Sequence, residues 1–221
     1  MIRLNLLVEG QTEETFVRDV LAPYFVGQEI FITPFIVTTS SGHKGGVVSY
    51  AKVKPQLIKL CRGDAKAYVS TMFDLYRLPK DFPGKDRKDY PVQGSGEQQA
   101  FFLESELGKD ISVPNFFPNL LVHEFEALLF TNPQKFSEWE DDWRVLAELQ
   151  KIASDFDTPE HINNDPLTAP SKRILRLMPK YDKPLHGSLI AYDIGLDAMR
   201  AACPHFSAWL RKIESLNVEA L

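Results

Sequence analysis

The chain is poor in the features that mark secreted, membrane-spanning and zinc-binding proteins. Only two of its 221 residues are cysteines, Cys61 and Cys203. Their wide separation excludes a closely spaced zinc motif and favours reduced, buried thiols. No apolar run approaches the roughly 20 residues that cross a bilayer. The N-terminal run predicts a buried strand rather than a signal peptide, because it holds one arginine and few apolar residues. We therefore expect a cytoplasmic protein without a membrane segment.

The chain also lacks an excess of positive charge. Thirty Asp and Glu residues outnumber 25 Lys and Arg, which gives a formal net charge of −5. Sequence-reading DNA-binding domains are usually basic, because phosphate neutralisation dominates their affinity. The overall charge therefore does not favour nucleic acid as a partner. It does not exclude nucleic acid as a substrate either, since an acidic metal centre lowers the charge by itself.

What the chain does have is an alternation of apolar runs and helical patterns over its first 130 residues. Short apolar runs predict strands at residues 2–8, 29–38, 66–73 and 116–122. Apolar residues at helical spacing predict helices at residues 12–26, 48–61 and 96–107. This order predicts an α/β fold with a mainly parallel sheet of about four strands flanked by helices. Beyond residue 132 the strand signals fade, so we expect an α/β core at 1–132 and a helical C-terminal portion at 133–221 packed on it.

Single residues indicate where some of these elements begin, end or lie. Thr12 is the expected N-cap of the first helix. Pro34 cannot donate a backbone hydrogen bond, so its strand should lie at an edge of the sheet or contain a bulge. Gly108 is expected to end the helix that begins near residue 96.

Carboxylates follow three of the predicted strands. Glu9 ends the first, Asp74 ends the third, and Glu124 and Glu126 follow the fourth. Open α/β sheets keep their sites at the carboxyl ends of the strands, and Mg²⁺ prefers carboxylate oxygens. Glu13 lies one helical turn beyond Glu9 and could reach back to it. We therefore predict a Mg²⁺ site built from these side chains.

Two questions about these carboxylates stay open at this point. Residues two apart share a face of a strand but not of a helix, so we expect only one of Glu124 and Glu126 to be a ligand. Glu13 and Glu14 could also be ordinary first-turn carboxylates that interact with the helix dipole. Asp74 could cap a turn.

Basic and histidine residues supply candidate phosphate contacts. Lys44 lies in a Ser/Gly-rich loop before a helix, where backbone N–H groups could help to hold a phosphate, although a solvated loop explains it equally well. Arg77 follows Asp74. Arg173 belongs to a basic set at helical spacing that could face a phosphate, an acidic partner or solvent. Lys183 and His186 lie in the segment YDKPLHG. His186 could serve as an acid–base group, a phosphate contact or a structural hydrogen-bonding residue.

Several segments together resemble one protein family. They are VEGQTEETFV, FDLYRLP, VHEFEALLF, APSKRI and YDKPLHGSLIAYDIGLDAMRAACPHFSAWL. The chain resembles the domain of unknown function 4276 family, which is grouped with Toprim-like proteins. Toprim is the topoisomerase–primase catalytic fold, which also occurs in overcoming-lysogenization-defect nucleases. The resemblance implies a Toprim-like α/β fold and phosphodiester cleavage assisted by Mg²⁺ or Mn²⁺.

The resemblance also implies roles for individual residues. Glu9 and Glu13 match the E-x-x-x-E arrangement of the nuclease branch. An Asp-x-Asp motif is expected after a later strand, but Asp74 is followed two residues on by Tyr76, so the second acid is missing. Glu124 or Glu126 would have to replace it. Apart from the resemblance, His186 joins Glu9 and Asp74 as a candidate catalytic residue, and Lys44, Arg173 and Lys183 are candidate phosphate contacts.

Two functional hypotheses follow. The first is a Mg²⁺- or Mn²⁺-dependent nuclease or phosphoryl-transfer enzyme, with nucleic acid as its substrate and an ATPase partner. The resemblance implies this partner, because members of the family are often encoded beside ATPases, some in bacterial defence systems. The second is a non-catalytic regulatory subunit of an ATPase complex, which Tyr76 and the acidic net charge favour. A metal enzyme requires the carboxylates to converge, whereas a binding module would let them diverge or pair with Lys and Arg.

Overall fold

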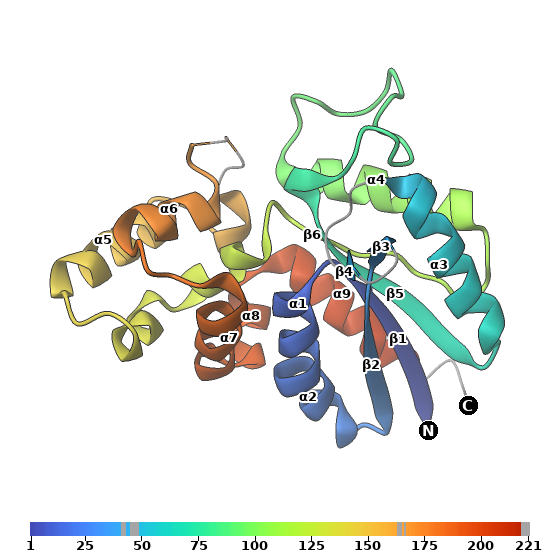
Figure 1. The fold of residues 1–221 in the computed structure, drawn as a ribbon, viewed down its shortest axis with the longest axis horizontal. Helices are drawn as coiled ribbons and strands as arrows, with labels where there is room; N and C mark the ends of the chain where they lie inside the picture. Colours follow the sequence, from blue (N-terminus) through green and yellow to red (C-terminus); the bar gives the residue numbers. More distant parts are fainter. Residues whose placement is uncertain (41–42, 45–48, 163–164, 166, 218–221) are drawn as a thin grey trace.

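A four-stranded parallel sheet forms the centre of the molecule (Figure 1). The computed structural model describes residues 1–40, 43–44, 49–162, 165 and 167–217. The sheet has the order β2-β1-β5-β6, and all neighbouring strands in it are parallel. Its strands are β1 (Ile2–Val8), β2 (Ile30–Ile36), β5 (Ala67–Asp74) and β6 (Leu120–Leu121). A separate antiparallel pair is formed by β3 (Thr38–Ser40) and β4 (His43–Lys44). The predicted α/β fold with a parallel sheet of about four strands is confirmed.

The order of the strands explains the sequence of two of them. β2 is an edge strand, and Pro34 lies within it opposite Leu6 of β1. An edge strand tolerates a proline because one side of its backbone needs no partner, so the prediction for Pro34 is confirmed. β1 is paired on both sides and is covered on both faces. It is therefore apolar almost throughout, as buried parallel strands are.

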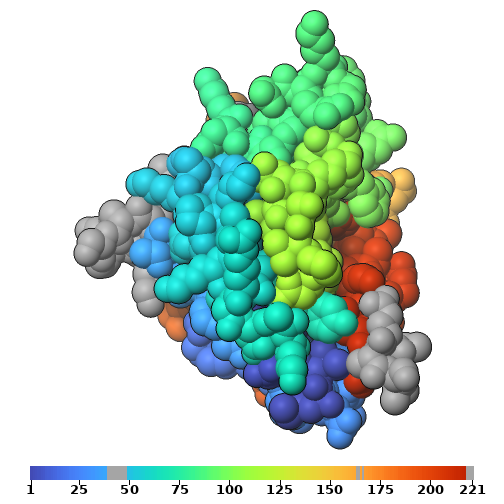
Figure 2. Space-filling model, turned by 90° about the vertical axis from the view of Figure 1, so that its right-hand side faces the viewer, coloured from blue at the N-terminus to red at the C-terminus, as the bar shows by residue number. Residues whose placement is uncertain are grey.

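Helices cover both faces of this sheet. One face carries the segment that follows β1, in which α1 (Gln11–Phe16) and α2 (Ala22–Val26) are joined by a π-helical turn, together with most of the C-terminal helices (Figure 1). The opposite face carries α3 (Tyr50–Gly63) and α4 (Gly96–Ile111), which lie side by side in Figure 2. The later helices are α5 (Trp143–Ser154), α6 (Pro170–Leu177), α7 (Ser188–Ile194), α8 (Leu196–Ala202) and α9 (Pro204–Ser215).

Two hydrophobic cores result, one on each face. The larger joins Leu6 of β1 to Phe16 of α1 and Phe206 of α9, so the N-terminal and C-terminal parts of the chain share it. The smaller joins Phe73 of β5 to residues of α3 and α4 such as Leu103. Burial of a Phe or Leu side chain contributes about 2 kcal/mol to the free energy of unfolding. The shared core packs the helical portion on the sheet, while the boundary at residue 132 stays a prediction. Among the described residues, no helix combines the length and the hydrophobicity needed to span a bilayer.

Three sequence predictions of element boundaries are wrong. Gly10, not Thr12, is the N-cap of α1, because the helix starts almost directly after β1 and Thr12 is already buried inside its first turn. α4 continues past Gly108 to Ile111, which is buried in the smaller core, and the helix ends where the backbone of Ser112 turns left-handed.

The third concerns the strand predicted at residues 116–122. Only Leu120 and Leu121 belong to β6, and Phe116 forms an isolated bridge with Val69. Pro118 lies between them and has no backbone N–H to donate to a neighbouring strand. The predicted strand is therefore interrupted before β6.

The long connection between β5 and α4 is fixed to the rest of the fold by two side chains. The Asp81 carboxylate accepts hydrogen bonds from the backbone N–H groups of Tyr50 and Ala51 at the start of α3. Phe82 is buried in the smaller core. The connection therefore caps a helix and contributes to the core, and its first residues stay next to the end of β5.

A buried ion pair links α9 to α4. Nε2 of His205 lies 3.1 Å from Oε1 of Glu104, and both side chains are largely buried. Burial alone would lower the pKa of His205, but its hydrogen bond to Glu104 and the charge of that carboxylate raise it above the ordinary value of 6.5. His205 therefore carries a proton in the folded protein over a wider pH range than it does in the unfolded chain.

This ion pair predicts a pH-dependent stability. A raised histidine pKa stabilises the fold fully below pH 6.5, and the stabilisation is lost as the pH rises through the folded-state pKa. We expect His205→Gln to lower the free energy of unfolding by about 2 kcal/mol at pH 6 and by clearly less at pH 9. Urea unfolding at the two pH values measures this, with His161→Gln as the control, since His161 is more exposed and lies 3.9 Å from Glu97. An equal loss at pH 6 and pH 9 would contradict the prediction.

Candidate metal centre

The ends of β1 and β5 bring the first two carboxylates together. Val8 of β1 is in register with Met72 of β5, so Glu9 and Asp74 follow at the same edge of the sheet. The backbone N–H of Asp74 donates a hydrogen bond to Oε2 of Glu9 at 3.3 Å. The predicted convergence of Glu9 and Asp74 is therefore observed.

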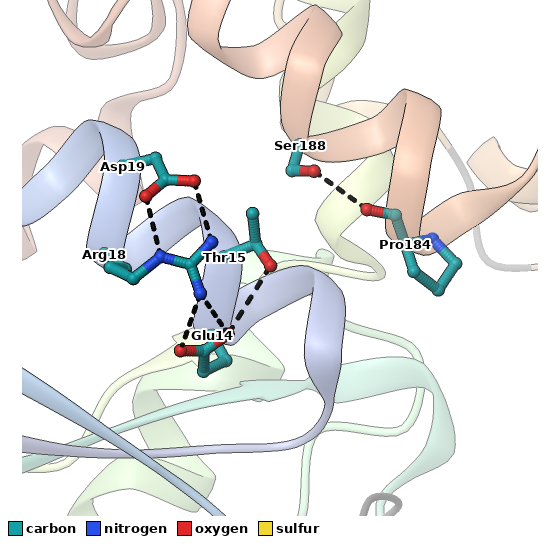
Figure 3. A network of polar contacts seen from close by, with 6 residues as sticks. All are labelled: Glu14, Thr15, Arg18, Asp19, Pro184 and Ser188. Carbon is teal, nitrogen blue, oxygen red and sulfur yellow. Dashed lines mark hydrogen bonds and ion pairs between the residues drawn. The ribbon is translucent and has the colours of Figure 1, made fainter.

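The two glutamates in the first turn of α1, Glu13 and Glu14, have different surroundings. The Glu13 side chain is 4% exposed, and its Oε1 lies 3.7 Å from Nζ of Lys183. Glu14 faces Arg18 instead, with 3.1 Å between the charged groups (Figure 3). Gly10 gives Glu13 the room to lie here, because a Cβ atom on Gly10 would be 3.3 Å from a Glu13 carboxylate oxygen. Glu13 therefore belongs to the same buried group of carboxylates as Glu9 and Asp74, and Glu14 lies outside this group.

The segment after β6 contributes both of its glutamates. Glu124 is extended, and Phe125–Thr131 forms a 3-10 helix, so the two side chains reach the site from different backbone conformations. Oε2 of Glu124 accepts a hydrogen bond from the backbone N–H of Ser171 in the first turn of α6, at 2.9 Å. Glu126 is fully buried and pairs with Lys183. Periodicity alone suggested that one of the two would point elsewhere, but both lie at the site.

A strained residue sets the direction of this segment. His123 has a φ of 66°, a conformation that is uncommon for residues other than glycine and that concentrates at functional sites. Its ring is buried against Gly96, where a Cβ atom would come within 2.7 Å of it. Burial, and secondarily the charge of His161, lowers the pKa of His123 to about 4. A neutral, fixed His123 therefore turns the chain just before Glu124.

Lys183 places a positive charge among these carboxylates. It begins the π-helical turn Lys183–Gly187 before α7. Its Nζ lies 3.0 Å from Oε2 of Glu126 and 3.4 Å from Oδ2 of Asp74, in addition to its contact with Glu13. Burial lowers the pKa of this ammonium, but the nearby carboxylates, Asp74 foremost, raise it well above its ordinary value. Lys183 is therefore charged, and it neutralises part of the acidic cluster.

One ammonium does not balance the whole cluster. Burial, then the charges of Asp74 and Glu13, raise the pKa of Glu9 to about 8. Burial is also the main cause that raises the pKa of Glu126 to about 7. The pKa of Asp74 is raised as well, again mainly by burial. Glu9 and Glu126 therefore bind protons at a higher pH than ordinary glutamates do, because additional positive charge is lacking. A divalent cation would supply that charge and displace the protons.

The carboxylates open into a small cavity with basic residues at its surface. The cavity, called the acidic cavity below, has a volume of about 200 Å³. Its lining includes four carboxylates, three basic side chains and one phenol, namely Glu9, Asp74, Glu124, Glu126, Arg77, Lys172, Lys183 and Tyr181. Arg77 and Lys172 are exposed, and the Lys183 side chain is 35% exposed. The acidic cavity thus combines buried oxygen ligands with basic groups that solvent can reach.

The residues of the acidic cavity match the chemistry of Mg²⁺ or Mn²⁺. Both carboxylate oxygens of Glu126 and the hydroxyl of Tyr181 are buried without a hydrogen-bond partner among the described residues, although Glu126 has its ion pair with Lys183. Hard divalent cations prefer such oxygens. As the described side chains stand, however, no three His, Cys, Asp or Glu residues are arranged to hold a metal ion. The Lys183 ammonium lies among the carboxylates instead, so a cation would require local rearrangement.

Two predicted site residues, His186 and Arg173, are not brought together with the carboxylates, and a third, Lys44, cannot be placed. Nδ1 of His186 accepts a hydrogen bond from the backbone N–H of Asp182 at 2.7 Å, and His186 lines an adjoining cavity that shares Tyr181 with the acidic one. Arg173 donates from Nε to the carbonyl oxygen of Thr168 at 2.6 Å, and its neighbour Lys172 lines the acidic cavity instead. The side chain of Lys44 lies outside the part of the chain that the structure describes.

Sequence reasoning missed Tyr181 as a residue of the acidic cavity. Tyr181 precedes Lys183 by two residues in YDKPLHG, a segment in which we considered only the basic and histidine side chains. Gly187 permits its position, since a Cβ atom there would be 2.8 Å from the Tyr181 hydroxyl. The proximity of a tyrosine to a glycine six residues later carries no sequence signal of its own.

Comparisons with known proteins give one family and a group of solved structures. The family described as Domain of unknown function (DUF4276) matches residues 8–214. No curated protein matches the chain. Structures of the C-terminal region of the Xanthomonas campestris pv. campestris OLD protein are similar over the whole chain. The one phased with mercury has 15% identity and a TM-score of 0.45, covering 100% of this chain and 98% of that chain. The one phased with iodine has 18% identity and a TM-score of 0.43 with the same coverage.

Proposed function

The chain belongs to the DUF4276 family, and on the basis of its acidic cavity we propose that it is a metal-dependent phosphodiesterase acting on nucleic acid. One observation carries the proposal: carboxylates from the ends of β1 and β5 and from the segment after β6 line a single cavity. Glu9, Asp74 and Glu126 would hold Mg²⁺ or Mn²⁺, with Glu13 and Glu124 beside them. When bound, the metal would polarise the phosphate and activate a water molecule.

The basic residues of the acidic cavity suit a phosphate. Arg77 and Lys172 are exposed beside the carboxylates, where they can attract and orient a phosphodiester. Lys183 can donate to a phosphate oxygen, because its ammonium is partly exposed and already lies among the carboxylates. These three cations offset the repulsion that an acidic site exerts on a phosphate.

Glu9 is a candidate for metal binding or for proton transfer. Burial and the charges of Asp74 and Glu13 raise its pKa to about 8 without a cation, and a bound cation would lower that pKa and leave Glu9 ionised. Its Oε2 already accepts a hydrogen bond from the backbone N–H of Asp74, which fixes its direction. Glu9 can therefore act as a ligand or as a proton acceptor at the same place in the acidic cavity.

A cleavage assay tests the proposal. Circular single-stranded DNA, supercoiled plasmid and RNA are incubated with the purified protein in Mg²⁺, Mn²⁺ or EDTA, with and without a candidate ATPase partner. We expect cleavage that EDTA abolishes and that Glu9→Gln strongly reduces. Asp86→Asn is the matched control, since Asp86 is an exposed acid on the connection after β5. Equal cleavage by the wild type and Glu9→Gln would refute the proposed site.

A non-catalytic subunit of an ATPase complex is the second candidate. It is favoured by the ion pairs of Lys183, which partly neutralise the cluster, and by Tyr76 at the position where the family resemblance leads us to expect a second acid. This candidate predicts no cleavage under any metal condition, and stable co-purification with the ATPase. Metal-dependent cleavage by the isolated chain would exclude it.

A further inference from the structure

A second cavity adjoins the acidic cavity and differs from it in character. It has a volume of about 570 Å³, within the range of pockets that hold small organic groups. Its lining includes Trp139, His186 and Tyr181, and we call it the aromatic cavity. Tyr181 also lines the acidic cavity. The two cavities therefore meet at Tyr181.

Two rings of the aromatic cavity, those of Trp139 and His186, are partly exposed. Trp139 is 38% exposed, and its ring centroid lies 5.1 Å from that of His186 at an angle of 55°. Since Nδ1 of His186 accepts the backbone hydrogen bond from Asp182, a neutral imidazole carries its proton on Nε2. That nitrogen has no hydrogen-bond partner among the described residues. The cavity thus offers a partly exposed indole ring and a hydrogen-bond donor.

The charges around the two cavities differ in a way that orients a nucleotide. Glu140 and Asp141 line the aromatic cavity together with Lys180. The carboxylates of the aromatic cavity can accept hydrogen bonds from the amino groups of bases. Arg77, Lys172 and Lys183 line the acidic cavity, where, together with the proposed cation, they would offset its carboxylates and attract a phosphate. A base therefore fits the aromatic cavity, and its phosphate fits the acidic one.

We propose that the aromatic cavity binds an unpaired base of single-stranded nucleic acid, stacked on Trp139, while the adjoining phosphate lies in the acidic cavity. This inference rests on the proposed function, since it assigns the substrate class of the same site. A base must leave the duplex to stack on a protein ring, so the geometry favours single strands over duplexes. Stacking depends little on base identity, so little sequence preference is expected.

Substitution of Trp139 tests this directly. Binding of a labelled 12-nucleotide single strand is measured by fluorescence anisotropy in Ca²⁺, beside a duplex of the same length and a free nucleoside monophosphate. We expect Trp139→Leu to weaken single-strand binding about tenfold, because the aliphatic side chain lacks an aromatic face. Trp139→Phe retains such a face and should bind almost as the wild type does. Trp143→Leu is the matched control, since Trp143 is 73% exposed and does not line the cavity. Circular dichroism verifies that each variant is folded.

The outcomes separate this inference from the proposed function. Equal single-strand binding by the wild type and Trp139→Leu, or an equal loss in Trp143→Leu, would overturn the stacking site. Tighter binding of the duplex, or of the free nucleotide, than of the single strand would overturn it as well. If metal-dependent cleavage persists unchanged in Trp139→Leu, the proposed function stands without this site. Trp139-dependent binding with no cleavage in Mg²⁺ or Mn²⁺ would support the stacking site and overturn the enzymatic proposal.

Discussion

Asp74→Asn is expected to lower metal-dependent cleavage about 100-fold or more while leaving the fold intact. An asparagine has nearly the same shape as an aspartate. Its side-chain oxygen can still accept the hydrogen bond that the backbone N–H of Phe125 donates to Oδ1 of Asp74 at 2.8 Å. It loses the negative charge that a divalent cation needs. Metal stabilisation of a transition state amounts to several kcal/mol, and each 1.36 kcal/mol is tenfold in rate. Initial cleavage rates measured over a range of Mg²⁺ concentrations give the effect.

A control variant and the dependence of the rate on Mg²⁺ concentration complete this test. Asp86→Asn removes the same charge from the exposed connection and should match the wild type. If Asp74→Asn only weakens metal binding, high Mg²⁺ will restore part of its rate. A variant that cleaves at the wild-type rate in low Mg²⁺ would contradict the role of Asp74.

Lys183→Met is expected to lower the free energy of unfolding by about 2 kcal/mol at pH 8 in EDTA. Removing one partner of a buried ion pair typically costs 3–5 kcal/mol. We expect less here because the Lys183 side chain is 35% exposed, and solvent screens the charge. Methionine keeps the length of the side chain and its apolar contacts. Urea unfolding compares the variant with the wild type.

The pH dependence of this loss gives a second test. The pKa of Glu9 is raised to about 8 and that of Glu126 to about 7. Below pH 5 both are protonated in the folded protein, so the uncompensated negative charge, and with it the cost of losing Lys183, becomes small. Mg²⁺ or Mn²⁺ should also restore stability at pH 8. A loss that is the same at pH 5 and pH 8, and that neither metal reduces, would contradict the account of Lys183 as a counter-ion.

The sequence predicted the positions of the site residues that directly follow strands. Glu9 and Asp74 each follow an apolar run, and parallel strands place such residues at one edge of the sheet. β1 and β5 are neighbours, so both acids reach the same cavity. The edge position of Pro34 was predictable for a similar local reason, because proline lacks a backbone donor.

What the sequence could not predict depends on tertiary structure. Lys183 is more than 100 residues from Asp74 in the chain, and only the packing of the C-terminal helices against α1 brings them together. Glu13 and Glu14 look equivalent in the sequence, but the orientation of α1 buries one of them and exposes the other to Arg18. Tyr181 reaches the site through close packing against Gly187.

Mn²⁺ binding measured by calorimetry in Glu13→Gln and Glu14→Gln tests the central claim most directly, because the two residues are adjacent in α1 and differ in what they face. The acidic cavity as a divalent-cation site predicts saturable binding by the wild type, an affinity about 10- to 100-fold lower in Glu13→Gln, and an unchanged affinity in Glu14→Gln. No saturable Mn²⁺ binding by the wild type, or equal affinities in the two variants, would contradict it.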